Sequence, residues 1–153
     1  MKVIGVGNRW RSDDAAGLIV ADRLRSTGIE VVDCEGEPIT LIAAFRDEDA
    51  VVIVDAVSSG AEPGTVHRLD AAEGPLPAEL FAASTHHLGV PDALELARAL
   101  DRLPAVCVVI GIEAARFEAG DELSPAVEAA VDAAATAVRR EVDACMSAHS
   151  RTT

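Results

Sequence analysis

Short apolar runs alternate with segments of helical spacing along this chain. The runs at 3–6, 29–32, 50–54 and 105–112 are too short for helices and predict buried strands. Residues 65–69 alternate between apolar and polar positions, which predicts an antiparallel strand at a sheet edge. Helical spacing covers 13–26, 38–45, 90–103 and 125–144. The pattern predicts an α/β fold, a three-layer α/β/α domain with a mostly parallel sheet of about five strands flanked by helices.

Two helix starts carry polar or proline residues of the expected kind. Ser12 is placed to cap a helix that begins at Asp13, and Asp13 and Asp14 would then complement the positive end of the helix dipole. Ser124 and Pro125 predict the start of the last helix. The chain has 153 residues and no linker or internal repeat, so we expect one domain over 1–146 and a frayed tail over 147–153.

Composition narrows the classes of partner. The formal net charge is -13, and such an acidic chain has little with which to neutralise the phosphates of a nucleic acid. No apolar run approaches about 20 residues, and no basic segment followed by an apolar stretch opens the chain, so we expect no membrane partner. The three cysteines show no CxxC spacing and fit reduced thiols. We therefore expect a cytoplasmic protein, and we expect it to be a monomer.

Acidic and imidazole side chains follow several of the predicted strands. Ligands of parallel α/β sheets bind outside the carboxyl ends of the strands, where Asn8, Asp14, Asp55 and His86 would converge. Two carboxylates and an imidazole suit nickel, zinc or another first-row divalent ion. Each residue also has a simpler explanation: Asp14 would stabilise a helix end, Asp55 would organise a loop, and His86 would be solvated. Consecutive helical positions diverge by about 100°, so the pattern does not choose between Asp13 and Asp14.

Four segments, in order, resemble one known family. The segments 5–17 (GVGNRWRSDDAAG), 54–57 (VDAV), 84–89 (STHHLG), and 110–113 (IGIE) with 123–127 (LSPAV) resemble those of the hydrogenase maturation proteases. The resemblance implies that Asp14, Asp55 and His86 are the catalytic and metal-contacting residues. It further implies that His87 lies beside the site, that Gly7 and Asn8 shape its floor, and that Asp13 is a supporting acid.

The family resemblance also implies a reaction. It implies an endopeptidase that removes the C-terminal extension of a nickel-iron hydrogenase large-subunit precursor after nickel insertion. The nickel would be supplied by the substrate, and the presence of another divalent ion in the resting protein stays open. Two departures from the commoner family pattern concern substrate choice: Asp14 stands where glutamate is frequent, and 33–38 (DCEGEP) replaces a glycine-rich segment.

Two alternatives come from other functional classes. A receiver-like phosphoacceptor signalling domain would use Asp55 and a hydroxyl from Ser84 or Thr85, but the lysine expected after its last strand is missing, since Lys2 is the only lysine. A non-catalytic metal- or anion-binding module would need only the backbone donors near Gly5 and Gly7. A dinucleotide cofactor is not expected because Trp10 replaces the next glycine of the fingerprint, and no GxSxG segment indicates a serine hydrolase.

Overall fold

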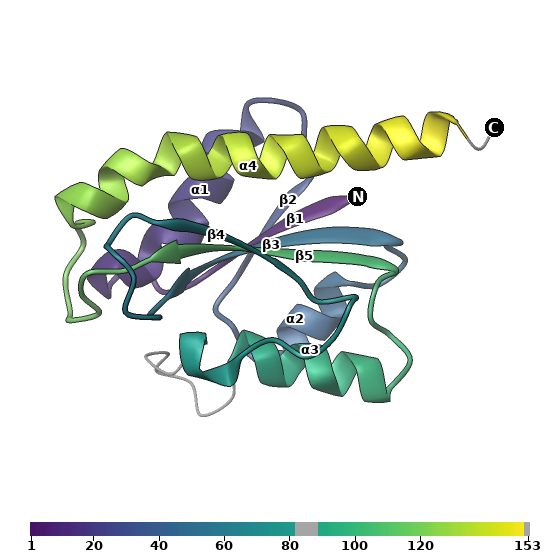
Figure 1. Cartoon of the computed structure of the whole chain (residues 1–153), viewed down its shortest axis with the longest axis horizontal. Coiled ribbons are helices and arrows are strands. Elements are labelled where there is room, and N and C mark those ends of the chain that lie inside the picture. Colours follow the sequence, from purple (N-terminus) through teal and green to yellow (C-terminus); the bar gives the residue numbers. More distant parts are fainter. Residues whose placement is uncertain (82–88, 152–153) are drawn as a thin grey trace.

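The computed structural model describes residues 1–81 and 89–151, which form a five-stranded sheet with helices on both faces (Figure 1). The strands are β1 (Lys2–Val6), β2 (Val31–Cys34), β3 (Ala50–Val57), β4 (Val66–Asp70) and β5 (Val106–Glu113). The helices are α1 (Ala16–Arg25), α2 (Pro38–Ala44), α3 (Val90–Ala99) and α4 (Pro125–Ser150). Two short 3-10 helices, η1 (Ser12–Ala15) and η2 (Ala78–Phe81), complete the order.

The strands lie in the order β2-β1-β3-β5-β4. Strand β1 pairs in parallel with β2 and β3, β3 pairs in parallel with β5, and β4 is antiparallel to β5 at one edge. The predicted three-layer α/β/α class, the five strands and the antiparallel edge strand are therefore confirmed. Because the chain leaves β1 toward β2 on one side and later returns to β3 on the other, the carboxyl ends of β1 and β3 form a switch point, where such folds bind ligands.

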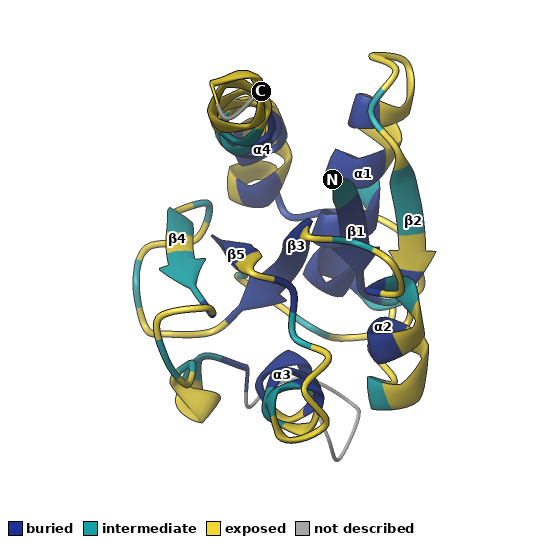
Figure 2. Cartoon of the chain, turned by 90° about the vertical axis from the view of Figure 1, so that its right-hand side faces the viewer, coloured by how far each residue is buried: buried dark blue, intermediate teal, exposed yellow. Residues whose placement is uncertain are grey.

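Two cores hold the three layers together. Helices α1 and α4 cover one face of the sheet, and α2 and α3 cover the other (Figure 2). Successive residues of β3 serve the two cores in turn: Val52 and Val54 pack beneath α1 and α4, while Val51 and Ile53 pack toward α2 and α3. Burial on both faces explains why this strand reads as an uninterrupted apolar run.

Several predicted boundaries are wrong by a few residues. Strand β3 continues to Val57 because its ladder with β5 extends to the pair Val57 and Glu113, so Asp55 lies inside the strand instead of ending it. The helix expected over 13–26 is divided into η1 and α1. Helix α3 ends at Ala99, before a turn in which Asp101 has a φ of 55°. Helix α4 continues to Ser150, so residues 147–150 are helical and not a frayed tail.

None of the helices within 1–81 and 89–151 combines the length and the apolar character that a membrane span requires.

Candidate active site

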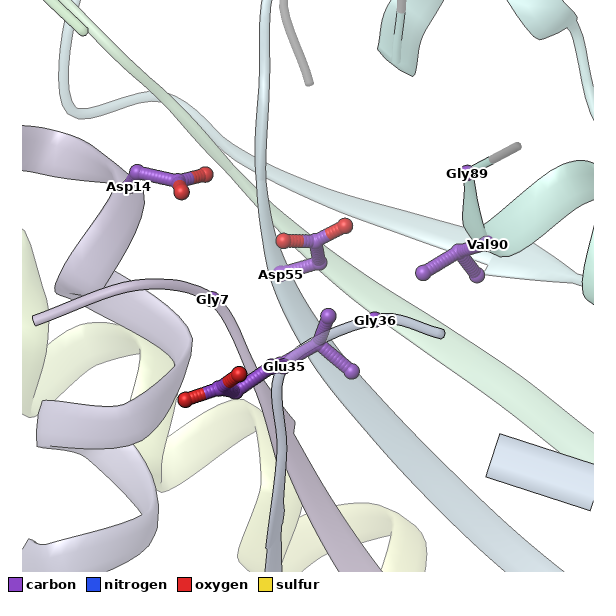
Figure 3. Close-up of a pocket in the computed structure, with 8 residues that line it drawn as sticks. Gly7, Asp14, Glu35, Gly36, Asp55, Gly89 and Val90 are labelled. Carbon is purple, nitrogen blue, oxygen red and sulfur yellow. The ribbon is translucent and has the colours of Figure 1, made fainter. Parts of the chain in front are cut away.

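Asp14 and Asp55 line one pocket at the switch point. The other residues of its wall come from the end of β1, the segment after β2 and the start of α3: Val6, Gly7, Glu35, Gly36, Gly89 and Val90. Figure 3 shows Asp14 reaching in from the side of η1 and Asp55 from β3, with Gly89 and Val90 on the far side. Each aspartate is 8% exposed. Two segments separated by some forty residues in the chain thus bring their carboxylates to one place, as the sequence predicted for these two residues.

Gly7 allows η1 to lie close enough to the end of β1 for Asp14 to reach the pocket. Its φ is 148°, and a Cβ at this position would lie 1.9 Å from the carbonyl oxygen of Asp14. The next backbone N–H, that of Asn8, donates to the same oxygen over 3.3 Å. Any side chain at position 7 would therefore push η1, and with it Asp14, away from the strand.

Arg11 provides a positive charge beside Asp14. Its Nη1 lies 3.5 Å from Oδ2 of Asp14, and its guanidinium group lies over the ring of Phe117 at 5.9 Å from the ring centre. This Nη1 is buried and makes no hydrogen bond within the described residues. The ion pair partly offsets the cost of burying the Asp14 carboxylate.

The environment of Asp55 favours its neutral form. Burial raises the pKa of the Asp55 carboxyl well above its ordinary value, and the negative charge of Asp14 raises it further. A hydrogen bond of 2.9 Å from the backbone N–H of Ala56 to Oδ1 acts in the opposite direction. A buried pair of carboxylates of this kind takes up a proton or a cation, and such perturbed groups are frequent at functional sites.

The start of α3 faces the two carboxylates. Gly89 and Val90 line the pocket, and the backbone N–H of Gly89 donates to Oδ2 of Asp92 over 3.0 Å, which holds the first turn of the helix. The partial positive charge at a helix N-terminus complements nearby anions. Asp14 and Asp55 thus lie at the end of α3 that best accommodates negative charge.

Asp13 points away from the pocket and is fully buried. Its Oδ2 accepts hydrogen bonds from the backbone N–H groups of Ala115 at 2.8 Å and Arg116 at 3.0 Å and from the Ser124 hydroxyl at 2.8 Å. Its Oδ1 accepts one from the Ser124 N–H at 2.7 Å. The structure therefore separates the two consecutive aspartates: Asp14 faces the pocket, and Asp13 fastens η1 to the segment before α4.

The expected cap at Ser12 is wrong. Its hydroxyl donates to the carbonyl of Glu118 over 2.8 Å and makes no capping bond to its own helix. Asn8 is not among the residues that line the Asp14 and Asp55 pocket; it lines the neighbouring groove, and its Oδ1 accepts a hydrogen bond of 2.9 Å from the N–H of Trp10. Gly7 does line the pocket, at the place expected for its floor.

The predicted histidines His86 and His87, like Ser84 and Thr85, lie outside the described residues. Within 1–81 and 89–151, no group of three or more histidine, cysteine or acidic side chains is arranged to hold a metal ion. Two members of the predicted ligand set are therefore together, and the third stays a prediction.

Sequence reasoning missed two charged residues near the site. Arg11 stands three positions before Asp14, a spacing at which side chains on a helical turn meet, and this signal could have indicated the ion pair. Glu113 is buried at the end of β5 and accepts hydrogen bonds from Ser59, Gly60 and His67. Burial would raise the pKa of Glu113, but these hydrogen bonds outweigh it and hold the pKa below its ordinary value. Glu113 thus fixes the loop after β3 as an anion.

Comparison with known proteins gives consistent results. Residues 20–141 match the family model described as hydrogenase maturation protease. The hydrogenase 2 maturation protease of Escherichia coli (strain K12) is 31% identical over 140 residues, covering 86% of this chain and 84% of that protein. The hydrogenase expression/formation protein HupD of Thiocapsa roseopersicina is 28% identical over 144 residues; the match covers 85% of this chain but 65% of that relative's length.

Solved structures show the same fold. The hydrogenase maturating endopeptidase HybD from E. coli superposes with a TM-score of 0.81 at 28% identity, covering 94% of this chain and 92% of that one. The [NiFe] hydrogenase maturation protease HybD from Thermococcus kodakarensis gives a TM-score of 0.72 at 30% identity, covering 91% and 96%. These matches do not favour the receiver-like domain or the non-catalytic binding module, and they confirm the resemblance seen in the sequence. The chain belongs to the hydrogenase maturation protease family.

Proposed function

We propose that this protein is an endopeptidase that removes the C-terminal extension of a nickel-iron hydrogenase large-subunit precursor after nickel has been inserted, with the nickel carried by the precursor. The observation that carries the proposal is the buried pair of carboxylates, Asp14 and Asp55, in one pocket at the switch point of a maturation protease fold. Burying two like charges destabilises a protein, so such a pair is retained where a cation or a proton is to be bound.

The proposed metal-binding side chains suit a substrate that already carries a metal ion. We propose His86 as the third donor; it stands three residues before Gly89, which lines the pocket, and three residues span at most about 11 Å. Two carboxylates and one imidazole, without a thiolate, are a modest set for nickel, so the precursor must supply the remaining donors. A nickel-free precursor would then lack the link between its peptide and the pocket, which gives selectivity for the loaded form.

As an alternative to contacting the ion, Asp55 is suited to proton transfer in the hydrolysis. When bound, the nickel of the precursor would polarise the scissile carbonyl or activate a water molecule. In its ionised form, a carboxyl whose pKa is raised above its ordinary value accepts a proton from attacking water more readily than an ordinary aspartate does, and it can return that proton to the leaving amine nitrogen. The Asp14 carboxylate, which pairs with Arg11, would contact the cation.

Cleavage of nickel-loaded and nickel-free precursor is the deciding experiment. The shortened subunit, resolved by mass spectrometry, should form with the loaded precursor, and the variants Asp14→Asn, Asp55→Asn and His86→Gln should each lose cleavage. Asp132→Asn, on the solvent side of α4 with an 80% exposed side chain, is the matched control and should cleave normally. Equal processing of both precursors would overturn the role of nickel, and full activity of the Asp14 and Asp55 variants would overturn the site.

Three finer expectations remain predictions with direct measurements. Metal analysis of the purified protein checks whether the resting protein holds a divalent ion. Sedimentation velocity checks the monomeric state, and cell fractionation checks the cytoplasmic location.

A further inference from the structure

Trp10 is a large apolar side chain presented to solvent on a fixed backbone. It is 73% exposed and is the only tryptophan of the chain. The backbone N–H of Trp10 donates to Oδ1 of Asn8 over 2.9 Å, and the backbone carbonyl of Trp10 accepts a hydrogen bond of 2.9 Å from the N–H of Gly120. Tryptophan is usually well buried, and a tryptophan held outward by hydrogen bonds on both sides of its peptide unit is typical of a contact residue.

A groove beside Trp10 adjoins the Asp14 and Asp55 pocket. Leu18 and Cys34 line the groove together with the indole. Gly7 and Glu35 belong to the walls of both the groove and the pocket, so the two hollows adjoin; Figure 3 shows these two residues at the edge of the pocket. A chain segment with its scissile bond at the aspartates would continue directly into the groove.

The charges along the groove favour a basic neighbour for the apolar contact. The Arg9 guanidinium is already engaged by Asp22 at 2.7 Å and by Asp33 at 3.2 Å, and Asp33 also pairs with Arg25. Glu35 is exposed and makes no hydrogen bond or ion pair within the described part of the chain. Its carboxylate therefore remains as the uncompensated charge where the groove meets the pocket.

We propose that this groove is a substrate subsite that holds an extended peptide segment of the precursor next to the scissile bond. In this subsite Trp10 packs against an apolar side chain of that segment, and Glu35 pairs with a basic side chain beside it. The proposal rests on the endopeptidase function proposed above. It adds the chemistry by which the protein recognises its substrate, and it places this recognition on Trp10 and Glu35, beside the aspartates.

Kinetics and binding test the subsite separately from the protease function. With nickel-loaded precursor, Trp10→Ala should raise KM about tenfold or more while kcat changes little, and Trp10→Phe should recover most of the loss. Glu35→Gln should raise KM at low salt and have little effect at high salt, because an exposed ion pair is screened. Met146→Ala, an exposed apolar residue near the end of α4, is the control and should leave KM unchanged.

The single tryptophan also permits a direct observation. Protein labelled with 5-fluorotryptophan has one fluorine resonance, from position 10, which should shift when the precursor is added to the cleavage-deficient Asp14→Asn variant. A shifted resonance without cleavage by the wild-type protein would support the subsite and overturn the protease proposal. Cleavage with an unmoved resonance and an unchanged KM in Trp10→Ala would overturn the subsite and leave the protease proposal standing.

Discussion

Replacing Asp13 with alanine should destabilise the fold, although Asp13 is next to a proposed catalytic residue. The substitution removes the acceptor of three backbone N–H groups, those of Ala115, Arg116 and Ser124, and of the Ser124 hydroxyl. A buried donor that loses its acceptor costs about 1 to 3 kcal/mol. Since two of the three N–H groups are only partly buried, water can reach them, and we expect a total loss of about 4 kcal/mol in the free energy of unfolding.

Chemical denaturation measures this loss, and the neighbouring aspartate provides the comparison. Urea unfolding followed by circular dichroism should show the midpoint for Asp13→Ala well below that of the wild type. The thermal midpoint should fall by roughly 8 to 16 °C, at about 2 to 4 °C per kcal/mol for a chain of this size. Asp14→Asn should stay within about 1 kcal/mol of the wild type, because relief of the repulsion with Asp55 offsets the weaker contact with Arg11.

The opposite pattern would refute this division of roles. An Asp13→Ala protein that is as stable as the wild type but does not cleave would make Asp13 a chemical residue. A large loss of stability in Asp14→Asn, with intact stability in Asp13→Ala, would exchange the two assignments.

Three further predictions concern the pocket and its surroundings. Because the pKa of Asp55 is raised in the fold, ionisation of this carboxyl lowers the stability of the protein as pH rises above the ordinary value of 3.8. Asp55→Asn should therefore be more stable than the wild type at pH 7, and this difference should vanish toward pH 4. Thermal unfolding in the presence of a chelator measures the difference. Gly7→Ala should lose several kcal/mol or fail to fold, because the added methyl group would lie 1.9 Å from the Asp14 carbonyl oxygen; urea unfolding checks this, and a stable variant would contradict the close approach. The pKa of Glu113 is lowered in the fold, so the stability that its carboxylate contributes should be present above the ordinary pKa of 4.5 and be lost as pH falls. Glu113→Gln should be less stable than the wild type by about 2 kcal/mol at pH 7 and approach the wild type in acid. Urea unfolding at several pH values measures this, and a difference in stability that does not change with pH would refute the role of the carboxylate.

Much of the fold could be predicted from the sequence because the three central strands, β1, β3 and β5, are covered on both faces. Residues 50–54 form an apolar run without alternation, which few structures other than a central parallel strand accommodate. The boundaries of the helices and strands could be predicted less well, since they depend on partners elsewhere in the chain. Strand β3 extends past Asp55 because Glu113 pairs opposite Val57, and no local pattern in β3 indicates this.

Part of the site could be predicted from the sequence. The position of Asp55 in an α/β sheet followed from the order of the elements. The choice between Asp13 and Asp14 did not, because it depends on Ala115, Arg116 and Ser124, which lie 102 to 111 positions later. In the sequence, Trp10 indicates only that a glycine of the dinucleotide-binding fingerprint is replaced. Its exposure beside a groove depends on the folded structure.

The bonds from Asp13 to the segment before α4 also bear on biosynthesis. While the ribosome is still adding the second half of the chain, the first strand and its aspartates have already emerged, but Ser124 has not been made. Chains grow at roughly 5 to 20 residues per second, so the amino-terminal half waits several seconds for these contacts. During that interval Asp13 lacks these partners, so η1 is fastened in its final place only near the end of translation.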